Sequence, residues 1–182
     1  DILLLEVGLG GRLDATNVVP NVIASIITEI SFDHEHFLGS TLSKISKEKC
    51  GIIKNSTPVI TISQKNEIMS IIKENCLNKN ATLYLIEKKN FKVSSNSFSF
   101  CLDKENIDLP LPALKGDHQF DNASCAIIAS QKTVGLRLKK NIIESSLSKI
   151  NWNGRLHNLK GSIASKYPFQ DIWVDAAHNY LG

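Results

Sequence analysis

Residues 3–19 read LLLEVGLGGRLDATNVV, an apolar run that leads into a glycine-rich loop. Only Glu6 interrupts the apolar side chains of residues 2–7, so we expect a strand that is buried on both faces, as in a parallel sheet. The loop that follows contains three glycines, which let a backbone approach a ligand closely: Gly8, Gly10 and Gly11. Because ligands of open α/β sheets bind at the carboxyl ends of strands, this stretch predicts a ligand-binding loop.

The next part of the chain alternates between strand and helix patterns. Apolar runs that predict three more strands lie at residues 22–28, 58–62 and 82–86. Helical periodicity at 42–50 and 68–77 predicts helices between them, with Thr41 and Ser63 as N-caps and Gly51 as a C-terminal stop. This alternation predicts an α/β fold with a mainly parallel sheet flanked by helices.

The second half begins with a different pattern. Short alternation over residues 91–102 predicts a hairpin, and the prolines of 109–112 predict an extended connector. We expect helices near 122–134 and 140–150, and another short buried strand at 171–175, which reads DIWVD.

Composition excludes several classes of protein. The chain is 42% hydrophobic and 21% charged, as is usual for globular domains, and its formal net charge is +3. Lys and Arg are scattered, which argues against nucleic-acid binding. No apolar run approaches the ~20 residues of a membrane span. The four cysteines form no CxxC pair and predict reduced thiols, as in the cytoplasm. We therefore expect a cytoplasmic protein with no membrane or nucleic-acid partner, and separately a monomer.

The glycine loop matches neither common phosphate-binding motif. The spacing GxGG lacks the third glycine of a dinucleotide fingerprint, and no GK[ST] is present. Glu6 is the informative residue, because a carboxylate in an apolar strand is costly unless it is paired or bound to a cation. Two interpretations stay open, a salt bridge between Glu6 and Arg12 and a metal ligand.

A second polar cluster follows the predicted strand at 22–28. Asp33, His34 and His36 lie within four positions. Two interpretations stay open: these residues are hydrogen-bonded within a loop, or they are ligands of a metal ion. At 3.6-residue periodicity Lys49 falls on the same helix stripe as the apolar residues before it. It either extends past the helix end to solvent or is a buried amine able to carry a CO2-derived carbamate, whose oxygens suit Mg²⁺.

Together these residues resemble one family. The segments LEVGLGGRLDATNVV, FDHEHFLG, KEKCGIIK, GDHQFDNA, NGR and DAAHN are similar to folylpolyglutamate synthase and dihydrofolate synthase, in the Mur ligase superfamily. They occur in the family's order from Leu3 to Asn179. The resemblance implies that residues 1–168 form the C-terminal part of a central ATP-binding domain. It also implies that 169–182 begin a Rossmann-like C-terminal domain with its first strand.

The resemblance implies a reaction as well. ATP phosphorylates a pterin-linked carboxylate of dihydropteroate or folate, and the amine of L-glutamate attacks the acyl phosphate to form an amide. The implied cofactors are Mg²⁺, with two ions expected, and a lysine carbamate made from CO2; ATP is a co-substrate. Since the reaction brings anions together, metal ions and an arginine must offset their charge.

Site residues follow from the same resemblance. Glu6 and His34 match magnesium ligands, and Lys49 matches the carbamylated lysine. Asp14 matches a contact to the pterin substrate, and Arg12 beside it is a further candidate for substrate binding. Lys49 and His34 are thereby expected in the catalytic centre.

The nucleotide residues lie further along the chain. Gln119 and Asn122 match the motif that faces the adenine. Arg155 matches a catalytic arginine that contacts the phosphates, and Asp175 and His178 match nucleotide contacts.

The chain departs from the family pattern at three places. The family's phosphate-binding glycine loop is absent from the sequence and is expected upstream of Asp1. Asn153 stands where the arginine motif of the family usually has proline, and Tyr180 stands where the family usually has proline after His178 and Asn179. We interpret the chain as a fragment, and two alternatives stay open. One is a UDP-muramoyl peptide ligase of the same superfamily, against which GLGGRLDATN argues, and the other is a non-catalytic nucleotide-binding fragment.

Overall fold

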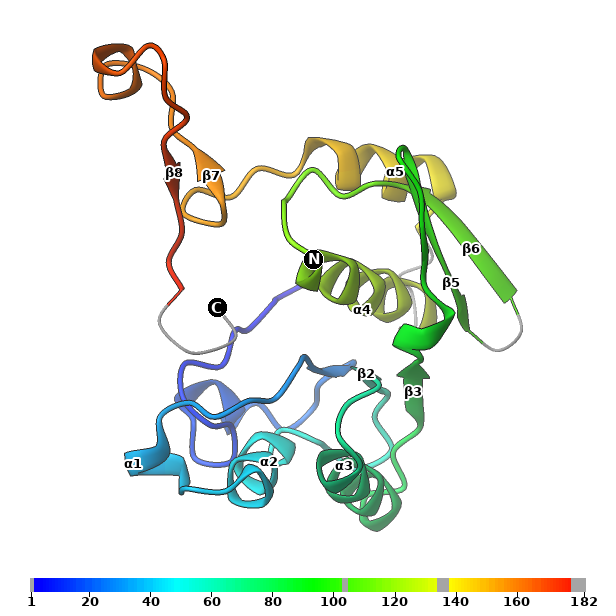
Figure 1. Ribbon diagram of the computed structural model, residues 1–182. Coiled ribbons are helices and arrows are strands. Elements are labelled where there is room, and N and C mark those ends of the chain that lie inside the picture. The colour runs from blue at the N-terminus through cyan, green and yellow to red at the C-terminus, as the bar shows by residue number, and fades with distance from the viewer. Residues whose placement is uncertain (1, 103–104, 134–137, 178–182) are drawn as a thin grey trace.

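The computed structural model describes residues 2–102, 105–133 and 138–177. A parallel sheet lies at its centre, with strands β1 (Ser25–Ile27), β2 (Val59–Ile62) and β3 (Leu83–Ile86) in the order β1-β2-β3. Helices cover both faces of this sheet, with α2 and α3 on one side and α4 on the other (Figure 1). The predicted α/β class and the three strand predictions between residues 22 and 86 are confirmed.

The central strand explains why this sheet is stable. All four residues of β2 are buried, and side chains of a strand point alternately to opposite faces. Val59 packs into the core below the sheet, while Ile60 and Ile62 pack into the core above it. A strand of this kind reads as a continuous apolar run because water reaches neither face.

The core below the sheet is built by α2 (Leu42–Cys50) and α3 (Asn66–Asn78), with the short α1 (Glu35–Leu38) before them. Thr41 caps α2 as predicted, since its side chain accepts a hydrogen bond from the Lys44 backbone N–H, and Gly51 ends that helix. The prediction that Ser63 caps the next helix is wrong. Helix α3 begins later, and the Ser63 hydroxyl accepts the Lys88 backbone N–H instead.

The core above the sheet is closed by a second, antiparallel sheet and two helices. Its strands are β4 (Lys92–Val93), β5 (Ser97–Leu102) and β6 (Glu105–Pro110), and the helices are α4 (His118–Lys132) and α5 (Lys140–Lys149). Phe98 and Phe100 of β5 are fully buried against Ile128 of α4 and other apolar residues of this core. The predicted hairpin and both predicted helices are therefore confirmed, although α4 begins four residues before its predicted start.

The last described segment forms a two-stranded antiparallel ladder of β7 (His157–Asn158) and β8 (Trp173–Val174). With the 3₁₀ helix η3 (Ala164–Lys166), it extends away from the rest of the chain (Figure 1). The prediction that residues 171–175 form a buried strand is wrong in its burial, because Trp173 and Val174 are exposed. Their pairing with β7 crosses the predicted division at residue 168, which stays a prediction.

The predicted strand at residues 2–7 is also wrong. No strand forms there, and Leu3 and Leu4 are 76% and 86% exposed. Hydrophobicity alone cannot make a strand, since its backbone N–H and C=O groups need a neighbouring strand. No helix in the described part of the chain combines the length and the hydrophobicity that crossing a membrane requires.

Candidate functional site

The glycine loop lies against the C-terminal end of α2. The Arg12 backbone N–H donates to the Glu48 carbonyl over 2.8 Å, so the loop satisfies a carbonyl at the end of the helix. The approach is so close that a Cβ atom on Gly51 would lie 2.4 Å from Arg12 Cα. Gly10 has a φ of 66°, a left-handed conformation that favours glycine. The loop and the helix that carries Lys49 therefore form one packed unit.

Asp14 shapes this loop from within. One carboxylate oxygen accepts the backbone N–H groups of Gly8 and Leu9, over 3.1 and 2.9 Å. The other accepts the hydroxyl and the backbone N–H of Thr16, over 2.6 and 2.9 Å. The Thr16 hydroxyl, with these backbone donors, lowers the pKa of Asp14 to about 2. The carboxylate also caps the 3₁₀ helix η1 (Ala15–Val18), so one side chain fixes the path of residues 8–16.

Arg12 has a different partner from the one considered for it. Its guanidinium pairs with Glu48 on α2, with Nη2 3.1 Å from Oε1 and Nε also donating to the carboxylate. The interpretation that Glu6 pairs with Arg12 is therefore wrong. Glu6 lies exposed in the segment that leads into the loop. Arg12 holds the loop to the helix, and 56% of its side chain is still exposed to solvent.

His34 lies at the start of α1 in an uncommon conformation. Its φ of 48° places a non-glycine residue in the left-handed region, and its backbone N–H donates to the Asp33 carboxylate over 2.8 Å. The His34 ring is exposed. Among the described residues, no group of three His, Cys, Asp or Glu side chains could hold a metal ion. The interpretation of Asp33, His34 and His36 as a self-contained metal site is therefore not supported.

Lys49 differs from the other lysines of α2. It is half-buried, whereas Lys44 and Lys47 are exposed. The prediction that its stripe of the helix points toward the core is thus confirmed for Leu42 and Ile45, which are buried, and partly for Lys49. The glycine loop and Lys49 meet at the same end of the helix, where a Cβ atom on Gly11 would lie 3.0 Å from the Lys49 carbonyl oxygen.

The predicted nucleotide residues of α4 line an open recess between α4 and α5. This recess has a volume of about 350 Å³ and is mostly apolar, with Gln119 and Asn122 among its few polar side chains. Gln119 is buried, and its amide nitrogen lies 2.9 Å from the His118 ring nitrogen Nε2. A recess of this size with a few fixed polar groups is typical of small-molecule sites.

Arg155 opens onto an adjoining recess of about 210 Å³. The two recesses share Leu114 and Ile150 in their walls, so they meet between the segment before α4 and the C-terminal end of α5. Asp175 lies beside Arg155 and accepts the Leu156 backbone N–H over 2.6 Å and that of Ala177 over 2.7 Å. These two bonds, and the nearby positive charge of Arg155, lower the pKa of Asp175.

The structure thus groups seven of the predicted residues in two places, while Glu6 lies exposed before the glycine loop and His34 lies at the start of α1. The first contains Arg12, Asp14 and Lys49 at the glycine loop, and the second contains Gln119, Asn122, Arg155 and Asp175 around α4. His178 lies outside the described residues. Sequence reasoning missed His118, which contacts Gln119, and a charged network of Glu29, Lys88 and Asp121. A signal for that network exists in the sequence, because Glu29 and Lys88 each lie two residues after the end of an apolar strand.

Comparison with known proteins identifies the family of the chain. Residues 1–130 match the model of the Mur ligase middle domain. The chain is 36% identical to dihydrofolate synthetase of Saccharomyces cerevisiae, over 97% of this chain and 42% of the relative. It is 30% identical to dihydrofolate synthase/folylpolyglutamate synthase of Bacillus subtilis, over 100% of this chain and 43% of the relative.

The fold agrees with solved structures as well. E. coli FolC in complex with DHPP and ADP superposes with a TM-score of 0.75 at 30% identity, over 95% of this chain and 39% of that chain. The chain spans less than half the length of the relatives it matches.

Proposed function

Because the chain belongs to the Mur ligase family through its middle domain, we propose that it is part of an ATP-dependent ligase that joins L-glutamate to dihydropteroate, to folate polyglutamates or to both. The relatives named dihydrofolate synthetase and folylpolyglutamate synthase support these substrates over a UDP-muramoyl peptide. The observation that carries the proposal is the pair of adjoining recesses, one lined by Gln119 and Asn122 and the other by Arg155.

The reaction has two steps. An oxygen of the substrate carboxylate takes the γ-phosphoryl group of ATP, and ADP leaves. The amine of glutamate then attacks the acyl carbon, phosphate leaves with the electrons of the broken C–O bond, and the amine loses a proton. Both steps bring anions together, so positive charge held in place beforehand lowers the barrier.

The recesses around α4 suit a nucleotide. A purine fits the apolar recess, and amide side chains such as Gln119 and Asn122 can form paired hydrogen bonds with the adenine edge. Arg155 in the adjoining recess can then offset phosphate charge, while Asp175 holds the backbone next to it. ADP bound in the structure of E. coli FolC supports this role. His178 stays a predicted nucleotide contact.

The loop side of the site suits magnesium that is shared with the substrates. Glu6, His34 and Lys49, the last as a carbamate, would hold the two expected Mg²⁺ ions. Magnesium usually keeps several waters and binds one or two carboxylates plus substrate phosphates, so it needs no complete cage of protein side chains. Bound Mg²⁺ supplies charge stabilisation for the transferring phosphoryl group.

On the substrate side we assign Asp14 and Arg12 to the pterin-linked substrate. Asp14 holds the backbone of the loop and Arg12 ties it to α2, so both set the shape that a substrate meets. The compartment is the cytoplasm, which the free thiols of all four cysteines support, and the active unit is a monomer.

Lys49→Ala in the full-length polypeptide tests the proposal. We expect the unmodified protein to release ADP and form the amide product from dihydropteroate, glutamate and MgATP. Loss of the carbamate should lower kcat by at least about 100-fold, because fixed charge at the transferring group is lost. Lys47→Ala is the matched control, since Lys47 is exposed on the same helix and should leave kcat within about 2-fold. Equal turnover in both variants would show that Lys49 has no such role.

A further inference from the structure

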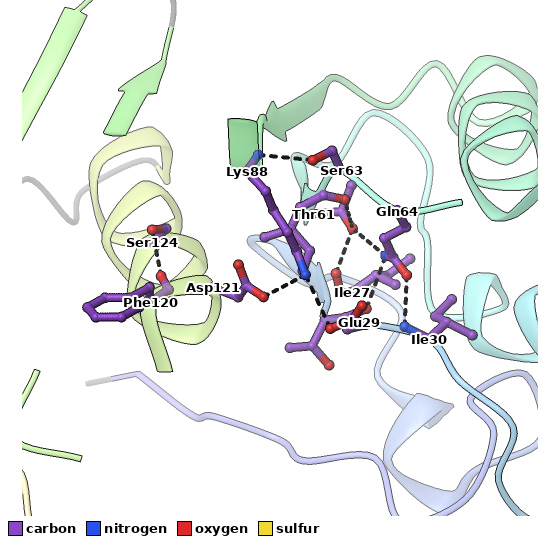
Figure 2. A network of polar contacts seen from close by, with 12 residues as sticks. Ile27, Glu29, Ile30, Thr61, Ser63, Gln64, Lys88, Phe120, Asp121 and Ser124 are labelled. Carbon is purple, nitrogen blue, oxygen red and sulfur yellow. Dashed lines mark hydrogen bonds and ion pairs between the residues drawn. The ribbon is translucent and has the colours of Figure 1, made fainter. Parts of the chain in front are cut away.

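A charged network joins α4 to the carboxyl edge of the parallel sheet (Figure 2). Lys88 lies two residues after β3, in the 3₁₀ helix η2 (Lys88–Asn90), and its ammonium contacts two carboxylates. Lys88 Nζ lies 2.8 Å from Asp121 Oδ2 on α4 and 3.2 Å from Glu29 Oε2, two residues after β1. One side chain thus connects a helix with the ends of two strands.

The base of Lys88 is itself held in place. Its backbone N–H donates to the Ser63 hydroxyl over 3.0 Å, and the Ser63 backbone N–H donates to the Ile86 carbonyl over 2.8 Å. These bonds tie the start of η2 to the chain just after β2. The ammonium therefore projects from a part of the backbone that the sheet fixes.

The Glu29 segment is anchored in the same way (Figure 2). Gln64 accepts the Ile30 backbone N–H over 2.8 Å and donates to the Thr28 carbonyl over 3.2 Å, one residue to each side of Glu29. Its amide also donates to the Thr61 hydroxyl of β2. Both ends of the network that belong to the sheet are therefore rigid, and α4 is the element that the network can position.

Asp121 connects the charged network to the part of α4 that carries the proposed nucleotide residues. It lies between Gln119 and Asn122 on α4 and is only 8% exposed. The buried apolar residues of α4, such as Ile127 and Ile128, lie one to two turns further along the helix. Beside Asp121, the ring of Phe120 packs on that of Phe98 with centroids 5.3 Å apart. Apolar packing is non-directional, whereas a charge-assisted hydrogen bond fixes distance and direction. The Lys88–Asp121 contact is thus suited to fix the first half of α4.

We propose that Lys88 is a positioning residue for base recognition: through Asp121 it sets α4 so that Gln119 and Asn122 meet the adenine edge. This inference rests on the nucleotide site proposed above. Adenine and guanine differ in the hydrogen-bonding groups of the edge that Asn and Gln recognise. Misplacing the two amides should therefore weaken ATP more than GTP, a change in selectivity that a general loss of stability would not produce.

The test is nucleotide binding by isothermal titration calorimetry on the full-length polypeptide, with ATP and GTP as separate titrants. Asp121→Asn and Lys88→Met should weaken ATP binding by about 10-fold, the effect of one lost hydrogen bond, and GTP binding by less than about 3-fold. Glu29→Gln is the matched control. It removes the other carboxylate on the same ammonium, is 44% exposed and lies on the sheet side of the network, so both affinities should stay within about 2-fold.

Asp121→Glu covers the case in which the uncharged variants do not fold. It keeps the ion pair but lengthens the link by one methylene, so the ratio of ATP to GTP affinity should still fall. Lys88→Arg, which keeps the cation, should retain more of that ratio than Lys88→Met. If the ratio of ATP to GTP affinity is unchanged in Asp121→Asn, or in Asp121→Glu where the Asn variant does not fold, Lys88 has no positioning role. The proposed function would still stand in that case. An unmodified protein that binds no ATP overturns the proposed function instead.

Discussion

Residues 2–5 and strand β2 (Val59–Ile62) are both apolar runs, and both predict a strand buried on two faces, yet their surroundings differ completely. Ile60 is 0% exposed, whereas Leu4 is 86% exposed. The difference lies in their neighbours, since β2 pairs on both sides with β1 and β3 and has a packed core on each face. Burial of a strand is therefore a property of the sheet around it, and hydrophobicity only makes it possible.

The glycine loop lies between these two extremes. It has few buried side chains, and polar bonds and close backbone contacts hold it instead, from Asp14 inside the loop and from Arg12 to α2. The molecule thus combines a sheet held by burial, a loop held by hydrogen bonds, and an N-terminal run that neither holds.

The largest effect is expected from Ile60→Ala in the sheet. Because Ile60 is fully buried in the core above the sheet, removing its side chain should destabilise the protein by about 2–5 kcal/mol through lost burial and a remaining cavity. Urea unfolding with a fixed m-value measures this change. A loss below about 1 kcal/mol would mean that the upper core collapses around the site, and the contrast with residues 2–5 would weaken.

A smaller, pH-dependent effect is expected from Asp14→Asn in the loop. The pKa of Asp14 is lowered from its ordinary value of 3.8 to about 2 by its hydrogen bonds, so the bonded carboxylate stabilises the fold above pH ~4. That contribution is lost as the pH falls through about 2. The difference in unfolding free energy between wild type and variant should therefore shrink between pH 5 and pH 2. A constant difference over this range would show that the charge of Asp14 is not what holds the loop.

The smallest effect is expected from Leu4→Ser in the N-terminal run. An exposed side chain that contacts little should change stability by no more than about 0.5 kcal/mol. The same urea unfolding compares it directly with Ile60→Ala. A loss as large as that of the sheet variant would show that residues 2–5 are covered in the full-length polypeptide, and it would erase the contrast between the two runs.

Much of the fold followed from local patterns. The three parallel strands, helix α2 with its Thr41 cap and Gly51 end, and the β4–β5 hairpin are encoded by residues close in sequence, so periodicity and turn chemistry predicted them. Predictions failed where distant residues decide. The Ser63 hydroxyl does not cap a helix because it accepts the backbone N–H of Lys88. Arg12 pairs with Glu48, 36 residues further along the chain, and not with nearby Glu6.

The candidate site divides in the same way. The resemblance to folylpolyglutamate synthase and dihydrofolate synthase implied Gln119, Asn122 and Arg155 as nucleotide contacts, and their residue types suit a base and a phosphate. Nothing local indicated that Asp121 between the two amides would meet Lys88. That contact exists only because β3 and α4 pack together, and charge partners across a fold carry no periodic signal in the sequence.

The sequence by itself therefore determined the α/β class and the alternation of strands and helices, since these depend on short-range propensity, and its resemblance to a known family implied the residues of the two candidate clusters. The tertiary structure decided which apolar runs are buried, which charges pair, and that the recess of Gln119 and Asn122 adjoins that of Arg155. The physical reason is that packing between elements far apart in the chain decides both burial and charge pairing. The segment LLLEVGLGGRLDATNVV illustrates this, because its apolar run is exposed while the loop that follows is held in place by α2.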